Sequence, residues 1–312
     1  MNTDMILIFG VTASGKGRLA FDLAESISAE ILSIDSMKVY RRMDIGTAKP
    51  PREIRQRIRY HLIDVVEPSE SFSVASFLGL ANEAIQRIRS CKPIVAVGGT
   101  ALYIKALLYG LFEGPGTDEL IREQLRQRAQ AEGLEQLYGE LAKIDPAAAG
   151  RISANDAKRI IRALEVYQLS GKPISGFQQQ FSVKTPQHNW TIIGLRRDKA
   201  CENSRINSRV KKMIAAGLVD EVKSLLAEER PLSKQSRCAI GYAEIIDHLN
   251  GETSLEDAIE LIKKNSRRFA KSQRTWFKGF AGVNWLDIDA DEPAEKILDR
   301  TKMLLDSIRQ RH

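Results

Sequence analysis

Short apolar runs of strand length alternate with amphipathic segments over the first third of the chain. The amphipathic segments Arg18–Ile27 and Val74–Ser90 carry apolar residues at helical spacing, which is typical of helices with one buried face. Apolar strands that alternate with such helices predict a parallel sheet covered on both faces. We expect six strands, the last two in the second half of the chain: Met5–Phe9, Glu30–Ser36, Tyr60–Val66, Pro93–Val97, Trp190–Leu195 and Val283–Leu286.

The pattern changes between residues 113 and 188, where amphipathic helices follow one another without a strand. We expect these helices at Thr117–Glu132, Leu134–Leu141 and Ala154–Ser170. The sequence therefore predicts an inserted all-helical subdomain over residues 113–188. The core would consist of residues 1–112 and 189–312, with a helical C-terminal part at Lys199–Ala216, Leu218–Ala227, Ile240–Leu249 and Leu255–Phe280.

A glycine-rich loop joins the first expected strand to the first expected helix. Its sequence, Gly10-Val11-Thr12-Ala13-Ser14-Gly15-Lys16-Gly17, matches the phosphate-binding pattern G-x-x-x-x-G-K-[ST] up to the last position. Such a loop surrounds a phosphate with backbone N–H groups at a helix N-terminus, and its lysine reaches the outer phosphoryl oxygens. Gly17 stands where a hydroxyl residue normally contacts Mg²⁺.

Polar side chains follow two other expected strands. Asp35 ends the strand Glu30–Ser36, and Gly98-Gly99-Thr100 follows Pro93–Val97. Ligands of open α/β sheets collect at the carboxyl ends of the strands, so Asp35 is a candidate site residue. An alternative is that Asp35 caps the next turn.

Composition and charge narrow the classes of function. Lys and Arg number 47 against 40 Asp and Glu, and this net charge of +7 is compatible with a nucleic-acid partner without proving one. The three cysteines and four histidines are scattered, which argues against a disulfide framework or a zinc centre and fits a reducing cytoplasm. Without a signal pattern or a long apolar run, we expect neither secretion nor a membrane span.

Three groups of basic residues lie at helical spacing. Lys158, Arg159 and Arg162 share neighbouring faces of one expected helix, and Arg205 and Arg209 share a face of another. A third stripe, at residues 267, 271, 274 and 278, runs beside the aromatic residues Phe269, Trp276 and Phe280. Each basic face can bind a polyanion. Alternatively, each can be an ordinary solvated or ion-paired surface, and the aromatic residues can belong to the core.

Taken together, these blocks resemble the bacterial tRNA dimethylallyltransferase family. The resemblance covers nearly the whole chain in the family's order, and the block Asp44–Pro50 is far more specific than the phosphate loop. The other matching blocks are Gly10–Lys16, Ser33–Ser36, Val97–Tyr103, Arg159–Val166, Ile240–Tyr242 and Ala270–Trp276. The resemblance implies a P-loop NTPase-like parallel sheet with an inserted helical subdomain, in a cytoplasmic enzyme that we expect to be monomeric.

The resemblance also implies an activity. The family transfers a dimethylallyl group from dimethylallyl pyrophosphate to the exocyclic N6 amine of the adenosine next to the anticodon, on its 3′ side. The products are N6-dimethylallyladenosine and pyrophosphate. The partners would be the anticodon stem-loop of tRNA and dimethylallyl pyrophosphate, with Mg²⁺ as cofactor and no membrane.

The roles of individual residues follow by motif. Asp35 would accept the amine proton, Thr100 would orient the reacting end, and Arg205, preferred over Arg209, would add a cation from the opposite wall. The pyrophosphate would be held by Gly10, Thr12, Ala13, Ser14, Gly15, Lys16 and Gly17. Contacts with tRNA are implied for Asp35, Ser36, Met37, Lys38, Arg122, Lys158, Arg159, Arg162, Arg237 and Tyr242.

Gly17 departs from the family, which carries Thr at this position. Mg²⁺ would then be held through the pyrophosphate, with a water or Thr100 in place of the missing hydroxyl. Two alternatives stay open at this point. One is a tRNA-binding paralogue with weakened catalysis, and the other is a prenyltransferase or kinase that acts on free nucleotides.

Overall fold

A computed structural model describes residues 4–111, 114–177, 186 and 188–310 of the chain. These residues divide into two compact units. The first unit combines residues 1–108 with 186–312, and the second contains residues 109–185. The boundaries expected near 113 and 188 lie at or beside residues outside the described ranges.

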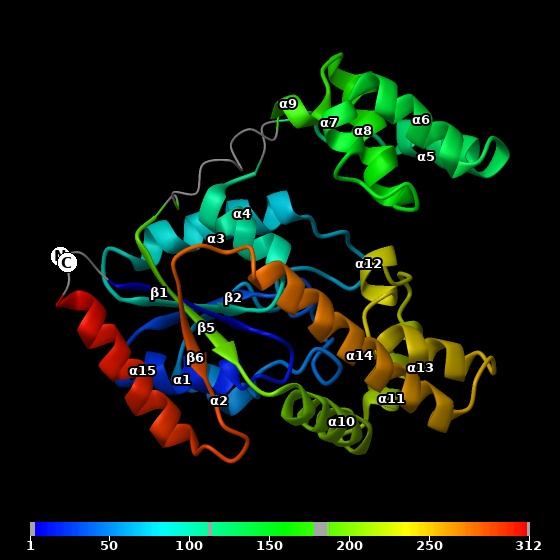
Figure 1. Cartoon of the computed structure of the whole chain (residues 1–312). Helices are drawn as coiled ribbons and strands as arrows, with labels where there is room; N and C mark the ends of the chain where they lie inside the picture. Colours follow the sequence, from blue (N-terminus) through cyan, green and yellow to red (C-terminus); the bar gives the residue numbers. More distant parts are fainter. Residues whose placement is uncertain (1–3, 112–113, 178–185, 187, 311–312) are drawn as a thin grey trace. The chain divides into compact units, whose positions relative to one another are not determined.

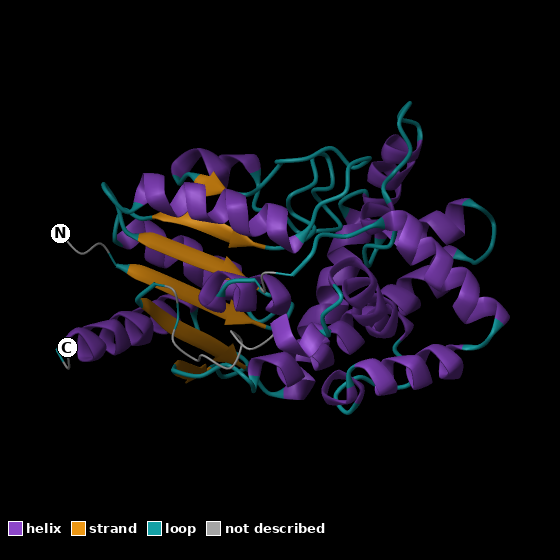
Figure 2. Ribbon diagram, turned by 90° about the horizontal axis from the view of Figure 1, so that it is seen from above, coloured by secondary structure: helices purple, strands orange, loops and turns teal. Residues whose placement is uncertain are grey.

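The first unit is built on a six-stranded sheet in which all neighbouring strands are parallel (Figure 2). The strand order is β3-β2-β4-β1-β5-β6. The strands are β1 Met5–Gly10, β2 Glu30–Ile34, β3 Tyr60–His61, β4 Ile94–Gly98, β5 Trp190–Arg196 and β6 Val283–Asp287. The predicted parallel sheet is confirmed.

The strand expected at Tyr60–Val66 is wrong in its second half. Leu62 and Asp64 have φ values of +62° and +56°, which no extended strand contains. The strand therefore ends at His61, and Val66 forms an isolated parallel bridge with Tyr40, outside the six strands of the sheet.

Helices cover both faces of the sheet (Figure 1). Alternate residues of β1 point to opposite faces, so Ile6 and Ile8 pack in the core with α1 (Lys16–Ser26), α2 (Arg52–Arg57) and α15 (Ala294–Arg309). On the other face lie α3 (Val74–Ile88), α4 (Ala101–Tyr109) and α14 (Leu255–Phe277), where the rings of Phe9 and Phe277 are 4.6 Å apart. The remaining helices of this unit are α10 Lys199–Ala215, α11 Leu218–Leu226, α12 Lys234–Arg237 and α13 Tyr242–Leu249.

The second unit is all helical, and it has its own apolar core. Its helices are α5 Glu119–Ala131, α6 Leu134–Ile144, α7 Pro146–Ala149, α8 Ala157–Ser170 and α9 Ile174–Phe177. Buried residues such as Leu125, Leu137 and Leu164 come from three different helices. In the described part of the chain, no helix is long and apolar enough to cross a bilayer.

A buried carboxylate organises one side of this helical unit. Glu165 on α8 has no exposed surface, and its Oε1 accepts a hydrogen bond from the Asp118 N–H at 2.7 Å. Its carboxylate also forms ion pairs with Arg122, at 3.0 Å, and with Arg162, at 2.7 Å. Arg162 donates further hydrogen bonds to the carbonyl oxygens of Pro115 and Gly116. Both guanidinium groups therefore hold the unit together.

This arrangement predicts a large stability effect at Glu165. Glu165→Ala leaves two partly buried guanidinium groups without their carboxylate and should lower the free energy of unfolding of the helical unit by about 3–5 kcal/mol. The measurement is native-state hydrogen exchange of the α5 and α8 amides. Glu123→Ala, which removes an exposed partner of Arg126 on α5, should leave this exchange nearly unchanged. Equal effects of the two variants would contradict the structural role of Glu165.

Candidate active site

The glycine-rich loop turns from the buried strand β1 into α1. The turn requires left-handed backbone at two positions, with φ of +63° at Ala13 and +98° at Gly15. It is closed by a hydrogen bond from the Ser14 N–H to the Val11 carbonyl, 3.1 Å long. The first turn of α1 therefore faces the inside of the loop, where its free N–H groups favour an anion.

Lys16 lies at the first position of α1, and its Nζ donates to the Val11 carbonyl at 3.1 Å. Burial, followed by the neighbouring cations Lys38 and Arg209, lowers the pKa of Lys16 to about 7, against an opposing effect of Asp35. A bound anion would stabilise the charged form and raise this pKa. The loop is thus arranged to take up negative charge.

Three arginines donate hydrogen bonds to residues of the glycine-rich loop. Arg197 Nε donates to the Ser14 carbonyl at 2.9 Å, and Arg205 Nε donates to the Ala13 carbonyl at 2.8 Å. Arg209 Nη1 donates to Thr12 Oγ1 at 3.1 Å. Arg205 is exposed, whereas Arg209 is half-buried and burial lowers its pKa. The geometry thus places Arg209 deeper in the site than the preferred Arg205.

Asp35 and Thr100 follow the neighbouring strands β2 and β4. Asp35 Oδ1 accepts hydrogen bonds from the N–H groups of Met37 at 2.9 Å and Lys38 at 3.2 Å, so the turn-capping role weighed above is present. Among the described residues none donates to its second oxygen, Oδ2. Thr100 Oγ1 accepts from the Ser36 N–H at 3.1 Å and so joins the two loops.

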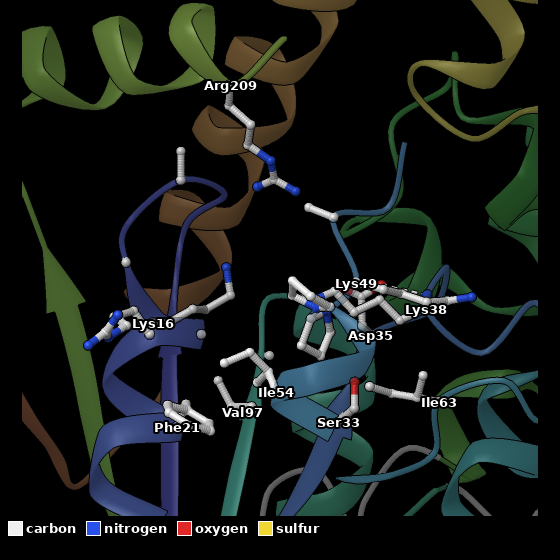
Figure 3. A pocket seen from close by; sticks show the side chains of 18 of the residues that line it. Lys16, Phe21, Ser33, Asp35, Lys38, Lys49, Ile54, Ile63, Val97 and Arg209 are labelled. Carbon is white, nitrogen blue, oxygen red and sulfur yellow. Dashed lines mark hydrogen bonds between the residues drawn. The ribbon is translucent and has the colours of Figure 1, made fainter. Parts of the chain in front are cut away.

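Two cavities meet at this group of side chains. The larger cavity, of about 770 Å³, is lined by residues of the glycine-rich loop and by apolar side chains such as those of Phe21, Ile54 and Val97 (Figure 3). The smaller cavity, of about 310 Å³, has Thr12, Ser36, Met37 and Thr100 in its lining. Their linings have four residues in common, which are Lys16, Asp35, Lys38 and Arg209. Figure 3 shows Arg209 reaching from α10 toward the space between Lys16 and Asp35.

The segment Asp44–Pro50 forms a fixed wall beside both cavities. Lys49 is buried, and its Nζ donates to Asp44 Oδ1 at 2.7 Å, to Asp64 Oδ1 at 2.5 Å and to the Tyr40 carbonyl at 2.5 Å. Glu221 on α11 accepts from the N–H groups of residues 44, 45 and 46. The hydrogen bonds of Lys49 and Glu221 therefore hold the segment Asp44–Pro50 in this conformation.

Tyr242 belongs to the same wall. Its side chain is fully buried, and its hydroxyl donates to Glu221 Oε1 at 2.6 Å. A Cβ at Gly46 would lie 2.4 Å from the Tyr242 ring, so glycine is required at this close approach. Tyr242 therefore lines the smaller cavity from within the core and has no accessible surface for a partner.

The other candidate tRNA-contacting residues differ in accessibility. Ser36, Met37 and Lys38 line the smaller cavity, and Arg237 is exposed on α12. On α8, Lys158 and Arg159 are exposed, and Arg159 pairs with Asp156 at 3.3 Å. Arg122 and Arg162 are engaged with Glu165 instead. The contact of Arg122 joins two helices, so spacing on one helix could not reveal it, whereas Arg162 lies three residues before Glu165 on α8.

Two residues in contact with the glycine-rich loop were missed in the sequence. Arg197 follows β5 directly, so its place at the carboxyl end of a central strand was a usable signal. Gln273 on α14 accepts a hydrogen bond from the Thr12 N–H across 261 residues. No local pattern marks such a distant contact.

Metal ligands are sparse in the described residues. They contain no group of three or more His, Cys, Asp or Glu side chains that could hold an ion. Gly17 is exposed, and a Cβ there would meet nothing within 4 Å. The oxygen donors in the site include the hydroxyl groups of Thr12, Ser36 and Thr100 and the Asp35 carboxylate. This donor set fits Mg²⁺ bound mainly by a phosphate ligand and water.

Comparison with known proteins gives one consistent result. The family described as "IPP transferase" matches residues 38–280, and the one described as "Isopentenyl transferase" matches residues 3–70. A tRNA dimethylallyltransferase of Geobacter metallireducens is 45% identical, with 91% of this chain and 93% of that protein covered. One of Acetivibrio thermocellus is 44% identical, with 97% of both chains covered.

Solved structures agree with these relatives. The tRNA isopentenylpyrophosphate transferase of Bacillus halodurans superposes with a TM-score of 0.72 and 38% identity, covering 98% of this chain and 97% of that one. A eukaryotic dimethylallyltransferase acting on tRNA gives a TM-score of 0.76 at 27% identity, covering 91% of this chain and 74% of that one. The likeness thus extends over the sheet, the glycine-rich loop and the helical segments.

Proposed function

The chain belongs to the IPP transferase family, and on that premise we propose how its site performs tRNA dimethylallyl transfer. In this reaction the N6 amine of the adenosine that follows the anticodon attacks the first carbon of dimethylallyl pyrophosphate. A carbon–nitrogen bond forms, the carbon–oxygen bond to pyrophosphate breaks, and one amine proton is lost. The observation that supports our assignment is the meeting of two cavities at Lys16, Asp35, Lys38 and Arg209.

The donor, dimethylallyl pyrophosphate, is assigned to the larger cavity. Gly10, Thr12–Gly15 and Lys16 would hold the diphosphate, with Arg209 and Arg205 as further cations. The apolar side chains of Phe21, Ile54 and Val97 suit a five-carbon hydrocarbon chain. Negative charge that develops on the leaving group would be stabilised by these preorganised donors.

The acceptor adenine is assigned to the smaller cavity, which adjoins the donor at Asp35. An exocyclic amine is a weak nucleophile, so a carboxylate that removes its proton during attack accelerates the reaction. Asp35 Oδ2 is available for that proton because Oδ1 is occupied by the backbone. The base must leave the anticodon-loop stack to enter, which costs a few kcal/mol.

We assign Mg²⁺ to the diphosphate, with Thr100 as the protein hydroxyl within the site. A divalent cation there neutralises charge on the leaving group. Gly17 offers no hydroxyl, so a water would take the place of that ligand. Lys16, Lys38 and Arg209 supply positive charge at the same place, which favours an active enzyme over a weakened paralogue.

Contacts with the tRNA backbone are proposed for exposed cations of both units. Lys158 and Arg159 lie on α8 of the helical unit, and Arg237 lies on α12 of the first unit. A free nucleotide would need no such surfaces, so they favour tRNA as the acceptor. We further propose a cytoplasmic monomer, in keeping with the three free cysteines.

The role of Asp35 gives the first test. Asp35→Asn keeps an oxygen that can accept from the Met37 and Lys38 N–H groups but removes the base. We expect kcat to fall about 10²- to 10⁴-fold. Affinity for inorganic pyrophosphate, measured by calorimetry, should stay equal or rise because a negative charge is lost beside the diphosphate. A kcat equal to that of the wild type would exclude Asp35 as the base.

Gly17 gives the second test. Gly17→Thr adds a hydroxyl where the structure has room, and Gly17→Ala adds only the Cβ as a matched control. Because a bridging water costs up to about 2 kcal/mol, the threonine variant should reach half-maximal rate at an about three- to thirtyfold lower Mg²⁺ concentration. The alanine variant should resemble the wild type. Identical Mg²⁺ titrations for both variants would refute this account of the metal.

The basic face of α8 gives the third test. Replacing Lys158 and Arg159 together by Ala should reduce the slope of log K against log salt for tRNA binding by about 1–2. Arg126→Ala with Arg128→Ala is the matched control, because it removes the same charge from α5 of the same unit, where each arginine pairs with two carboxylates. Equal slopes for the two double variants would make the α8 face an ordinary solvated surface.

A further inference from the structure

Gln273 joins two loops of the site through one buried side chain. It lies on α14 and is only 4% exposed. Its Oε1 accepts from the Thr12 N–H at 2.8 Å, and its Nε2 donates to the Gly99 carbonyl at 2.7 Å. Both ends of the amide are thus used on backbone groups of different loops.

These two loops carry the two halves of the site. Thr12 belongs to the glycine-rich loop, and its hydroxyl accepts from Arg209. Gly99 precedes Thr100, whose hydroxyl binds the Ser36 N–H beside Asp35. The Gln273 amide therefore connects the loop assigned to the diphosphate with the loop that holds the base.

The connection lies where the sheet no longer pairs the two strands. The register of β1 and β4 ends at Phe9 and Gly98, so Thr12 and Gly99 lie beyond the last paired residues. Beyond that point, the side-chain amide of Gln273 connects the two segments, because it accepts from Thr12 and donates to Gly99. The approach is close, because a Cβ at Gly99 would lie 2.5 Å from Gln273 Nε2.

The same face of α14 lines the smaller cavity. Ile262, Ser266, Phe269 and Gln273 follow one another at helical spacing, and all four line it. The helix face beside the proposed acceptor cavity is therefore also the face that connects the two loops. Gln273 therefore lines the proposed acceptor cavity and also contacts the loop assigned to the diphosphate.

We propose that Gln273 is a positioning residue that sets the distance between the diphosphate loop and the Asp35–Thr100 pair, and so controls turnover more than substrate binding. This inference rests on the proposed function. A misplacement of about 1 Å between reacting groups costs about 100-fold in rate, so loss of the amide should act on kcat. A buried amide that only filled the core would instead change stability.

The test uses two variants of the full chain with one matched control. Gln273→Met removes both hydrogen bonds with little change in length, and Gln273→Glu keeps an acceptor for Thr12. When ionised, the carboxylate of Gln273→Glu cannot donate to the Gly99 carbonyl, and when protonated it can. Gln86→Glu is the control, because Gln86 on α3 is exposed and lines neither cavity.

Turnover of tRNA with dimethylallyl pyrophosphate is measured from about pH 8 to about pH 6, with inorganic pyrophosphate binding alongside. We expect Gln273→Met to lose about 100-fold in kcat at every pH, with KM for tRNA and pyrophosphate affinity within about threefold of the wild type. Relative to the wild type, the kcat of Gln273→Glu should rise as the pH falls. The control should follow the wild type.

Two results would overturn the inference. One is a Gln273→Met enzyme with wild-type kcat, and the other is a loss confined to substrate affinity. Thermal melting shows whether Gln273→Met folds. If it does not fold, the inference is also overturned when the ratio of the Gln273→Glu kcat to the wild-type kcat stays constant across this pH range. Failure of the proposed function is distinguishable, because the wild type would then transfer no prenyl group.

Discussion

The site is organised by positive charge held in excess at a place partly closed to water. Lys16, Lys38 and Arg209 surround a single carboxylate, Asp35, and burial lowers the pKa of all three cations. Charged groups removed from water are costly unless an opposite charge balances them. The proposed diphosphate would supply that charge, so the unbalanced cluster indicates an anionic ligand better than the shape of either cavity does.

The fold provides this cluster through four adjacent parallel strands. The carboxyl ends of β2, β4, β1 and β5 deliver Asp35, Thr100, the glycine-rich loop and Arg197, respectively. Helices α10 and α14 then add Arg209 and Gln273 from distant parts of the sequence. The hydrogen bonds of Lys49 and Glu221 hold the wall at Asp44–Pro50 in place beside the cavities. Such preorganisation is what stabilisation of a leaving group requires.

The sequence predicted the features that depend on local patterns. The six strands, the glycine-rich loop and the position of Asp35 at a strand end all follow from neighbouring residues, and the structure contains them. The error at Tyr60–Val66 arose because positive φ at Leu62 and Asp64 leaves no mark in an apolar run. Arg122 showed only its charge, since its partner Glu165 is apparent only once α5 and α8 are packed. Arg162 lies three residues before Glu165 on α8, so that ion pair was a usable local signal. Gln273 lies in the family-matching block Ala270–Trp276, but its contact with the Thr12 N–H, 261 residues away, could not be inferred from that block.

The central claim is that this chain, with Gly17 in its phosphate loop, transfers a dimethylallyl group to tRNA. The most direct measurement is mass spectrometry of an unmodified tRNA transcript after incubation with the protein, dimethylallyl pyrophosphate and Mg²⁺. We expect a gain of one dimethylallyl group on the fragment that contains the adenosine 3′ to the anticodon, and no gain when that adenosine is replaced by guanosine. An unmodified transcript, together with prenylation of free adenine nucleotides by the same protein, would contradict it.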